Sequence, residues 1–406
     1  MNGEQTLAKR AAARALATIA IAQLLALSLW FSATAVSPQL RSLWGLTTSE
    51  EAGLTLAIQL GFVVGALVSA ILNLADIVRA RALFFASAVA GALANAGLLF
   101  VTSSTVSAAL VLRFLTGAFL AGVYPAGLKV VAGWFEHGRG RALGLLVGAL
   151  TVGSASPHLI RGIGLEWEGV IIAASLLTAL SALMMLRVGD GPFEVPTQRF
   201  RWRQVAMVVR DRGVRLSTYG YLGHMWELYA MWTWTATFLL ASEAASGTDY
   251  GSVAILTFAV IAIGGPGSWW AGALADRFGR TRVAGSAMAV SGACALATPA
   301  VFGAGPWLVV PLFLLWGATV VADSAQFSAM VTETARDEVR GTALTLQTAS
   351  GFLLTLVTIR LAPAIADATS WQWAFPVLAL GPLAGISAMV ILARSPISAR
   401  LAEGRG

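Results

Sequence analysis

The sequence has little charge and almost no cysteine or histidine. Charged residues make up 12% of its 406 residues, against about 25% in soluble domains, which excludes an ordinary soluble enzyme. A single cysteine, Cys294, excludes an internal disulfide, and with only three histidines the chain has no metal-ligand or redox motif. The catalytic patterns H-E-x-x-H, G-x-S-x-G and C-x-x-C and the phosphate loop are also missing. We therefore expect no cofactor, no metal site and no enzyme.

What the chain does have is apolar sequence, with 57% hydrophobic residues and a mean hydropathy of +0.76. A membrane-spanning helix needs about 20 mostly apolar residues. The first such segment ends in "FSATAVS", like a signal peptide, but its apolar run exceeds the about 7–15 residues of one, so we interpret it as a retained helix. The sequence predicts twelve spans, at 14–36, 52–74, 82–101, 106–131, 141–161, 170–188, 216–241, 251–273, 283–302, 307–330, 341–361 and 374–393.

The basic residues predict the orientation and the domain boundaries. Most of the 27 lysines and arginines fall in connectors that share one side of the membrane if the N-terminus is cytoplasmic, as the positive-inside rule requires. Because the net charge of +7 lies in these connectors, no nucleic acid partner is expected. The polar, basic segment 189–215 separates an N-terminal six-helix bundle, 1–188, from a C-terminal one, 216–406.

The two halves repeat each other at an offset of about 200 residues. "LADIVRAR" at 74–81 matches "LADRFGRTR" at 274–282, so that Asp76 corresponds to Asp276. Both halves begin on the same side of the membrane and contain an even number of spans, which makes the repeat parallel. Transporters with such repeats bind solute near the membrane midplane, between halves that rock to alternate access.

One connector carries a family motif. "GALADRFGR" at 272–280 fits G-x-L-a-D-R-x-G-R, and with the twelve-span repeat the chain resembles the major facilitator superfamily. The resemblance implies an all-α membrane protein with twelve transmembrane helices in two six-helix bundles related by a pseudo-twofold axis. It also implies cytoplasmic N- and C-termini. We expect a monomeric, multi-pass protein of a bacterial-type cytoplasmic (inner) membrane, in contact with the lipid bilayer.

The same resemblance implies a cytoplasmic gate that closes when the protein opens outward. An aspartate in this loop can accept hydrogen bonds at a helix N-terminus, and glycines permit close approach of helix ends. The alternative is that the basic residues only set orientation. The expected gate residues are Asp76, Arg79, Gly272, Asp276, Arg277, Gly279 and Arg280.

Two basic side chains in the first half are candidates for a solute or proton pathway. Arg113 in "RFLTGAFLAG" resembles the R-x-x-q-G motif of the family's fourth helix, and intramembrane charges are functional hypotheses by default. Snorkelling to the outer interface is the alternative for Arg113. His158 lies near the outer end of the fifth span. That span lacks the family's G-P-x-x-G-G antiporter signature, which disfavours drug–proton antiport.

The seventh span, in "YLGHMWELYAMWTW", places an acid close to the membrane midplane. Glu227 and His224 share one helical face, and His224 is the nearest candidate partner in sequence. Burial strongly penalises an ionised carboxylate, so Glu227 is predicted to take up and release a proton during transport. A permanently neutral, structural carboxyl is the alternative. Four lone polar residues are interpreted as hydrogen bonders between helices: Gln59, Asn73, Asn95 and Gln347.

In the tenth span, Asp323 and Gln326 lie three residues apart. They are predicted to bind solute, carry a proton or close the inner gate, with structural hydrogen bonding as the alternative.

The first half thus offers basic candidates and the second acidic ones, which favours a small anion carried with protons. "GVYPAGLKVVAGWF" is similar to the cyanate and nitrate/nitrite permease-like branch, although the nitrate signature is missing. A transition-metal carrier and a non-transporting assembly factor with this fold stay open as alternatives.

Overall fold

The computed structural model describes residues 2–135, 139–193 and 202–404, and all regular structure in these residues is helical. The first half contains eight α-helices. Their bounds are α1 Asn2–Leu27, α2 Ser37–Trp44, α3 Thr48–Ile71, α4 Leu74–Ile77, α5 Ala80–Ala96, α6 Val106–Ala132, α7 Arg139–Gly162 and α8 Trp167–Leu186. Short 3₁₀ turns join them, at η1 Thr34–Val36, η2 Gly97–Phe100 and η3 Ser103–Thr105.

The second half contains nine α-helices and several 3₁₀ segments. The α-helices are α9 Val205–Arg210, α10 Arg212–Ser246, α11 Val253–Ala262, α12 Gly264–Phe278, α13 Arg280–Val301, α14 Pro306–Val320, α15 Ser324–Thr334, α16 Arg340–Ala368 and α17 Leu380–Ala393. The 3₁₀ segments are η4 Trp202–Gln204, η5 Asp337–Val339, η6 Trp371–Trp373, η7 Pro376–Ala379 and η8 Pro396–Gly404. The C-terminal part of the expected linker is therefore helical, and its residues 194–201 lie outside the described residues.

Ten segments within the described residues are long and apolar enough to cross a membrane. They correspond to ten of the twelve expected spans. The expected spans 141–161 and 216–241 coincide with α7 and α10, which are helical but are not among these ten. Three expected continuous spans are interrupted within the described residues. Helix α1 ends at Leu27 and is followed by turns over residues 28–33, a turn at Ile263 separates α11 from α12, and turns over 321–323 separate α14 from α15.

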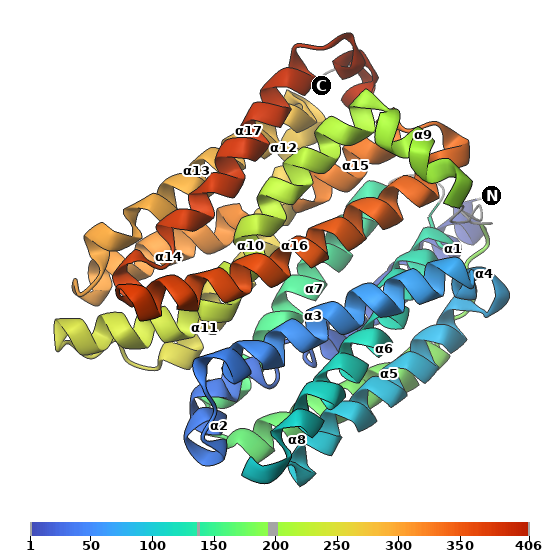
Figure 1. The fold of residues 1–406 in the computed structure, drawn as a ribbon. Coiled ribbons are helices and arrows are strands. Elements are labelled where there is room, and N and C mark those ends of the chain that lie inside the picture. The colour runs from blue at the N-terminus through green and yellow to red at the C-terminus, as the bar shows by residue number, and fades with distance from the viewer. Residues whose placement is uncertain (1, 136–138, 194–201, 405–406) are drawn as a thin grey trace.

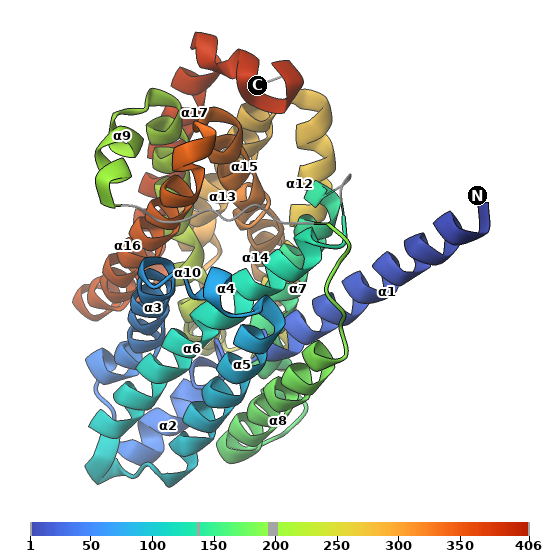
Figure 2. The same cartoon turned by 90° about the vertical axis from the view of Figure 1, so that its right-hand side faces the viewer.

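The helices gather into two groups that meet along a seam (Figure 1). Helices α1 to α8 form one group and α10 to α17 the other, and α3 packs against α16 at the seam, as α7 does against α11 and α12. The two chain ends lie at one end of the molecule, the terminal end, whereas α2 and the turn between α10 and α11 lie at the opposite, far end. In Figure 2 the first part of α1 leans away from the other helices.

Glycines bring the helices of each group into backbone contact. A Cβ atom added to Gly117 of α6 would lie 2.0 Å from the Ile58 carbonyl oxygen of α3, and one added to Gly61 would lie 1.9 Å from the Phe114 oxygen. In the other group, a Cβ atom on Gly223 of α10 would lie 2.4 Å from the Gly381 oxygen. Small residues at helix crossings are how membrane helices pack without a hydrophobic driving force between them.

Candidate functional site

The guanidinium of Arg113 is completely buried on α6. It donates five hydrogen bonds, and each ends on a neutral oxygen atom. Two acceptors are carbonyls of the turns that follow α1: Nη1 lies 3.1 Å from the Leu29 oxygen and Nη2 lies 2.6 Å from the Trp30 oxygen. The other acceptors are the Leu54 carbonyl, the Ser32 hydroxyl and the Asn95 amide oxygen. Arg113 takes part in no salt bridge found among the described residues.

The interruption of α1, which we call the α1 break (residues 28–33), is held by nearby serine hydroxyls and by Arg113 of α6. Helix ends leave carbonyl groups without intrahelical partners, and serine hydroxyls compete for such carbonyls. Ser28 Oγ donates to the Leu25 oxygen at 2.7 Å, and Ser32 Oγ donates to the Leu29 oxygen at 3.0 Å. Together with Arg113 these hydroxyls satisfy carbonyls at the end of α1, so the break is a stable element of the fold.

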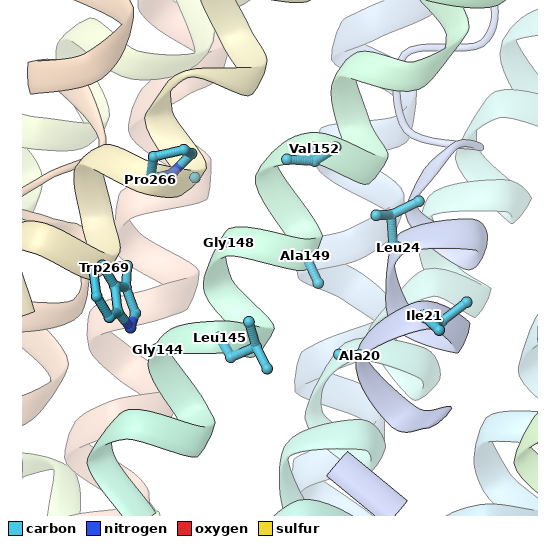
Figure 3. A pocket seen from close by; sticks show the side chains of 11 residues that line it. Ala20, Ile21, Leu24, Gly144, Leu145, Gly148, Ala149, Val152, Pro266 and Trp269 are labelled. Carbon is cyan, nitrogen blue, oxygen red and sulfur yellow. The ribbon is translucent and has the colours of Figure 1, made fainter. Parts of the chain in front are cut away.

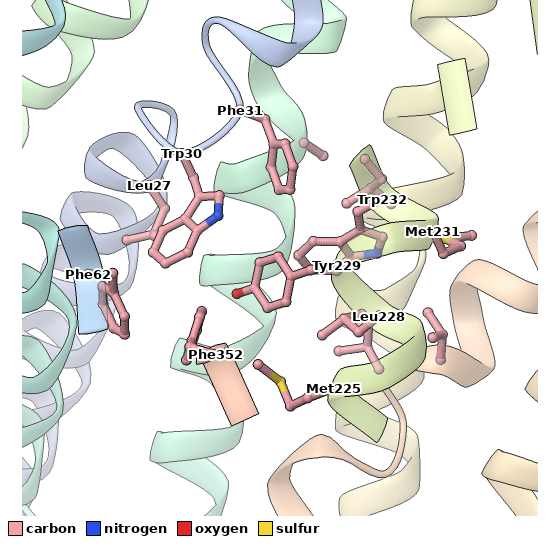
Figure 4. Close-up of a cluster of buried hydrophobic side chains, with 14 of the residues drawn as sticks. Leu27, Trp30, Phe31, Phe62, Met225, Leu228, Tyr229, Met231, Trp232 and Phe352 are labelled. Carbon is pink, nitrogen blue, oxygen red and sulfur yellow. The ribbon is translucent and has the colours of Figure 1, made fainter. Parts of the chain in front are cut away.

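The α1 break carries two aromatic rings to the seam. Trp30 and Phe31 face Tyr229 and Trp232 of α10, with Phe62 of α3 and Phe352 of α16 alongside (Figure 4). We call these six residues the seam cluster. Ring centroids are 5.7 Å apart for Trp30 and Tyr229, 6.0 Å for Phe31 and Trp232, and 4.7 Å for Phe62 and Phe352. All six side chains are buried, so the centre of the molecule is lined by rings from both groups of helices.

His158 of α7 is also buried, and its ring centroid lies 6.4 Å from that of Phe31. Its Nε2 atom has no hydrogen-bond partner among the described residues, and neither has the indole Nε1 of Trp30 or of Trp232. Figure 4 shows the Trp30 nitrogen turned toward the rings of α10. The seam cluster therefore contains buried donors for which the described part of the chain supplies no acceptor.

Glu227 lies inside the second group of helices, one turn along α10 from His224. Its side chain is 1% exposed. Oε1 accepts a hydrogen bond from Trp316 Nε1 of α14 at 2.6 Å, and Oε2 accepts one from Ser291 Oγ of α13 at 2.8 Å. The partners of this carboxyl are thus an indole and a hydroxyl. His224, the partner expected from sequence, makes its closest charged contact elsewhere.

That contact joins His224 to Asp323. His224 Nδ1 lies 2.7 Å from Asp323 Oδ1, and both side chains are buried. The two atoms lack the alignment of a hydrogen bond, so the contact is a close approach of two polar groups. Asp323 stands in the turns between α14 and α15, just after Thr319, whose hydroxyl donates back to the Leu315 carbonyl at 2.8 Å. The interruption between α14 and α15 places an acidic side chain in the buried interior.

Polar side chains continue from Asp323 toward the terminal end. Gln326 follows one turn later on α15, and its Oε1 accepts from Arg280 Nη1 at 3.1 Å. Arg280 Nη2 lies 2.7 Å from Oε1 of Glu333, whose side chain is 25% exposed. These contacts define a polar column, which runs from the buried interior to the surface. Its members, in order, are Glu227, His224, Asp323, Gln326, Arg280 and Glu333.

The expected gate residues of the second half surround the exposed end of this column. Gly279 has φ of +97°, a left-handed backbone that favours glycine. Asp276 is 69% exposed, with Oδ1 3.9 Å from Arg280 Nη1, and the Arg277 guanidinium lies 5.1 Å from the centroid of the Phe278 ring. No described atom lies within 4 Å of a Cβ position on Gly272, so close approach at Gly272 is not a feature of this conformation.

The expected gate of the first half is less fully described. The side chain of Asp76 lies outside the described part of the structure, and Arg79, at the start of α5, is exposed. Its neighbour Arg81 donates to the Val188 carbonyl at 3.2 Å and to Asp190 Oδ2 at 3.0 Å. At the far end, Arg360 Nη2 donates to Ser49 Oγ at 2.8 Å, which links α16 to α3 across the seam.

A pocket of about 490 Å³ lies apart from these groups, between α1, α7 and α12 (Figure 3). Its walls are apolar and include Leu24, Val152 and Pro266. Ile21 and Trp269, also in its lining, are about half exposed. An apolar pocket with such a rim suits hydrocarbon, so we do not place the solute there. Within the described residues, no three His, Cys, Asp or Glu side chains lie close enough to hold a metal ion.

Two groups of membrane helices that meet around a polar centre are the architecture of secondary transporters. The chain belongs to the Major Facilitator Superfamily, whose profile matches residues 19–322 and 227–406. It is accordingly a multi-pass membrane protein that transports a small molecule, and not an enzyme. A crystal structure of the nucleoside transporter NupG is similar, with a TM-score of 0.69 at 14% identity, over 93% of this chain and 99% of that one. This likeness shows the fold alone, and no curated protein matches the sequence.

Proposed function

We propose that the protein carries a small anion together with protons by alternating access. It would cross the bacterial-type inner membrane twelve times as a monomer, with both termini cytoplasmic and the two bundles divided at 189–215. The observation that supports an anionic substrate is the buried positive charge of Arg113. Its hydrogen bonds end on neutral atoms, including the Trp30 carbonyl. A buried charge without a counter-ion is costly, and an anion bound beside Trp30 would compensate it.

Proton coupling is supported by the polar column. Glu227 is enclosed among side chains, so a proton needs a route to it. We infer that protons move between Glu227 and the terminal end through His224, Asp323 and the side chains beyond. Each step in the column is a contact between polar atoms or one helical turn. In this scheme the proton path lies within the C-terminal bundle and the solute path at the seam, and His158 and Arg113 act on the solute side.

The gate residues fit the same cycle. In this conformation Arg360 and Ser49 link the bundles at the far end, whereas Asp276 at the terminal end is exposed. We propose that the conformation is open toward the cytoplasm and that Asp276, Arg277, Arg280 and the glycines Gly272 and Gly279 close that side in the outward-open state. Asp76 and Arg79 would do the same for the first half.

The test uses the full chain in proteoliposomes with an imposed pH gradient and labelled acetate, nitrate and benzoate. We expect the wild type to accumulate at least one of these anions. Glu227→Gln should abolish accumulation while exchange at equal pH persists. The exposed Glu338 supplies a matched control, Glu338→Gln, with normal accumulation. Undiminished accumulation by Glu227→Gln would refute the proton role.

A nucleoside, the solute named for NupG, is the second candidate. The observation that favours it is the seam cluster, because a flat base stacks well on aromatic rings. Labelled uridine therefore belongs in the same assay. Uptake of uridine without uptake of any anion would make a nucleoside the substrate in place of the anion. Uptake of neither would refute both substrate classes.

A further inference from the structure

The seam cluster has the composition of a binding site for a flat molecule. Phe31 and Tyr229 come from different bundles, and their rings are nearly parallel, with 21° between the planes and 6.4 Å between the centroids. Stacked carbon atoms are best separated by about 3.5–4.0 Å, so a ring between these two would need about 7 Å or slightly more. Rocking of one bundle against the other would have to part the ring planes to this separation to admit a planar group.

The polar atoms at this position are donors. The indole N–H of Trp30 is buried, has no acceptor within the described structure, and is turned toward the rings of α10. Arg113 donates to the main-chain carbonyl of the same residue. An indole can donate only, and a guanidinium attracts negative charge. A ligand at Trp30 is thus expected to present an acceptor that carries negative charge.

The two buried acids of the polar column, Glu227 and Asp323, have their contacts within the second group of helices. Both oxygens of Glu227 are engaged by Trp316 and Ser291, and Asp323 contacts His224, so these carboxyls face the inside of the second group of helices. A cationic ligand at the seam cluster would contact the faces of aromatic rings, but neither Glu227 nor Asp323 would be available to pair with its charge. The charge at the site therefore selects for an anion and the rings select for its shape.

We propose that the transported solute is a flat organic monoanion, an aromatic or conjugated carboxylate. Its ring lies between Phe31 and Tyr229, and its carboxylate accepts the Trp30 indole N–H in front of Arg113. This inference rests on the proposed anion transport and narrows its substrate class. Small inorganic anions lack the surface to fill the gap between the rings, and saturated rings are too thick for it.

The test is calorimetric titration of the full chain in lipid nanodiscs with four probes that separate charge from shape. Benzoate is flat and anionic, cyclohexanecarboxylate is anionic but puckered, benzamide is flat but neutral, and nitrate is anionic but small. We expect benzoate to bind at least tenfold more tightly than each of the other three.

Each other outcome overturns the inference in a distinguishable way. Equal binding of benzoate and cyclohexanecarboxylate, or preference for nitrate, would refute the claim that the solute is flat and leave the proposed anion transport intact. Equal binding of benzamide and benzoate would refute the anion itself and so also the proposed function. If none of the probes binds, the inference is refuted, and accumulation of acetate or nitrate in proteoliposomes then decides the proposed function separately.

Variants locate the site. Phe31→Leu keeps an apolar side chain but removes the flat face, and should weaken benzoate binding about threefold to tenfold, as expected for loss of one ring contact. Cyclohexanecarboxylate binding should change little. Phe31→Tyr should restore benzoate binding, and Phe100→Leu, at a ring that is 85% exposed, is the control. Tyr229→Leu tests the opposite face should Phe31→Leu not fold. Unchanged benzoate affinity in both Leu variants would overturn the inference.

Discussion

The Arg113 guanidinium donates to the main-chain carbonyl of Trp30, with 2.6 Å between Nη2 and the oxygen. This bond joins a charged residue of α6 to the α1 break, 83 positions earlier in the chain. It ties the charge that we assign to anion binding to the backbone that presents the aromatic rings. A movement of the α1 break therefore moves Arg113, and a movement of Arg113 moves the break.

Replacement of Arg113 should separate its charge from its hydrogen bonds. Arg113→Lys keeps a positive charge but cannot donate to all five acceptors, so we expect a loss of about 2 kcal/mol or more in the free energy of unfolding, with anion binding retained. Arg113→Gln should lose both. Denaturation in detergent and calorimetric titration measure the two effects. Equal anion affinity in the two variants would show that the charge is not used.

Substitutions of His224 and Asp323 should be coupled. Removing one partner of a buried pair typically costs about 3–5 kcal/mol, because the other charge is left uncompensated. His224→Phe and Asp323→Asn should therefore each destabilise the protein strongly, and the double variant should be far more stable than the sum predicts. A double-mutant cycle of unfolding free energies measures this coupling. Additive effects would mean that the 2.7 Å contact contributes nothing.

The α3–α6 crossing should tolerate no side chain at Gly117. A Cβ there would lie 2.0 Å from a main-chain oxygen, which cannot move aside as a flexible side chain would. We expect Gly117→Ala to cost at least about 1–3 kcal/mol, as overpacking does, and to lower the yield of monodisperse protein in size-exclusion chromatography. Gly144→Ala, at a position with open space around it, should behave as wild type.

The link between Ser49 and Arg360 should control opening at the far end. Ser49→Asp converts a hydrogen bond into an exposed ion pair, worth about 0.2–1 kcal/mol, and should slow solute exchange by up to about fivefold. Arg360→Ala in the same background should restore the rate. Faster exchange in Ser49→Asp would contradict the assignment of this contact to closure. Measurement at low ionic strength maximises the effect.

Sequence reasoning anticipated the helical fold and the family because long apolar runs and the motif at 272–280 are local signals. It missed the helix interruptions. Neither the α1 break nor the turns before Ser324 contain proline or glycine, and what holds the α1 break is a side chain 83 positions away. The serines at 28 and 32 were the available signal, but in a membrane segment they read equally well as interhelical hydrogen bonders.

The sequence supplied Glu227, His224, Asp323 and Gln326 as candidates, but it did not predict how these side chains are arranged. Glu227 was expected beside His224 because the two share a helical face, whereas its oxygens are engaged by Trp316 and Ser291. Partners on other helices cannot be read from the spacing of one helix. Asn95 does bond between helices, to Ser32 and Ser175, as expected, but both amide atoms of Gln59 have no partner among the described residues.

Arg113 donates hydrogen bonds to the main-chain carbonyl oxygens of residues 29 and 30, and every amino acid has such an oxygen. Residues 29 and 30 can therefore be substituted without loss of these hydrogen bonds. The side chains that the α1 break presents at the seam can change while the contact to Arg113 is kept. Evolution or protein engineering could therefore change the cargo by substituting a side chain of the break while the backbone contact to Arg113 is kept.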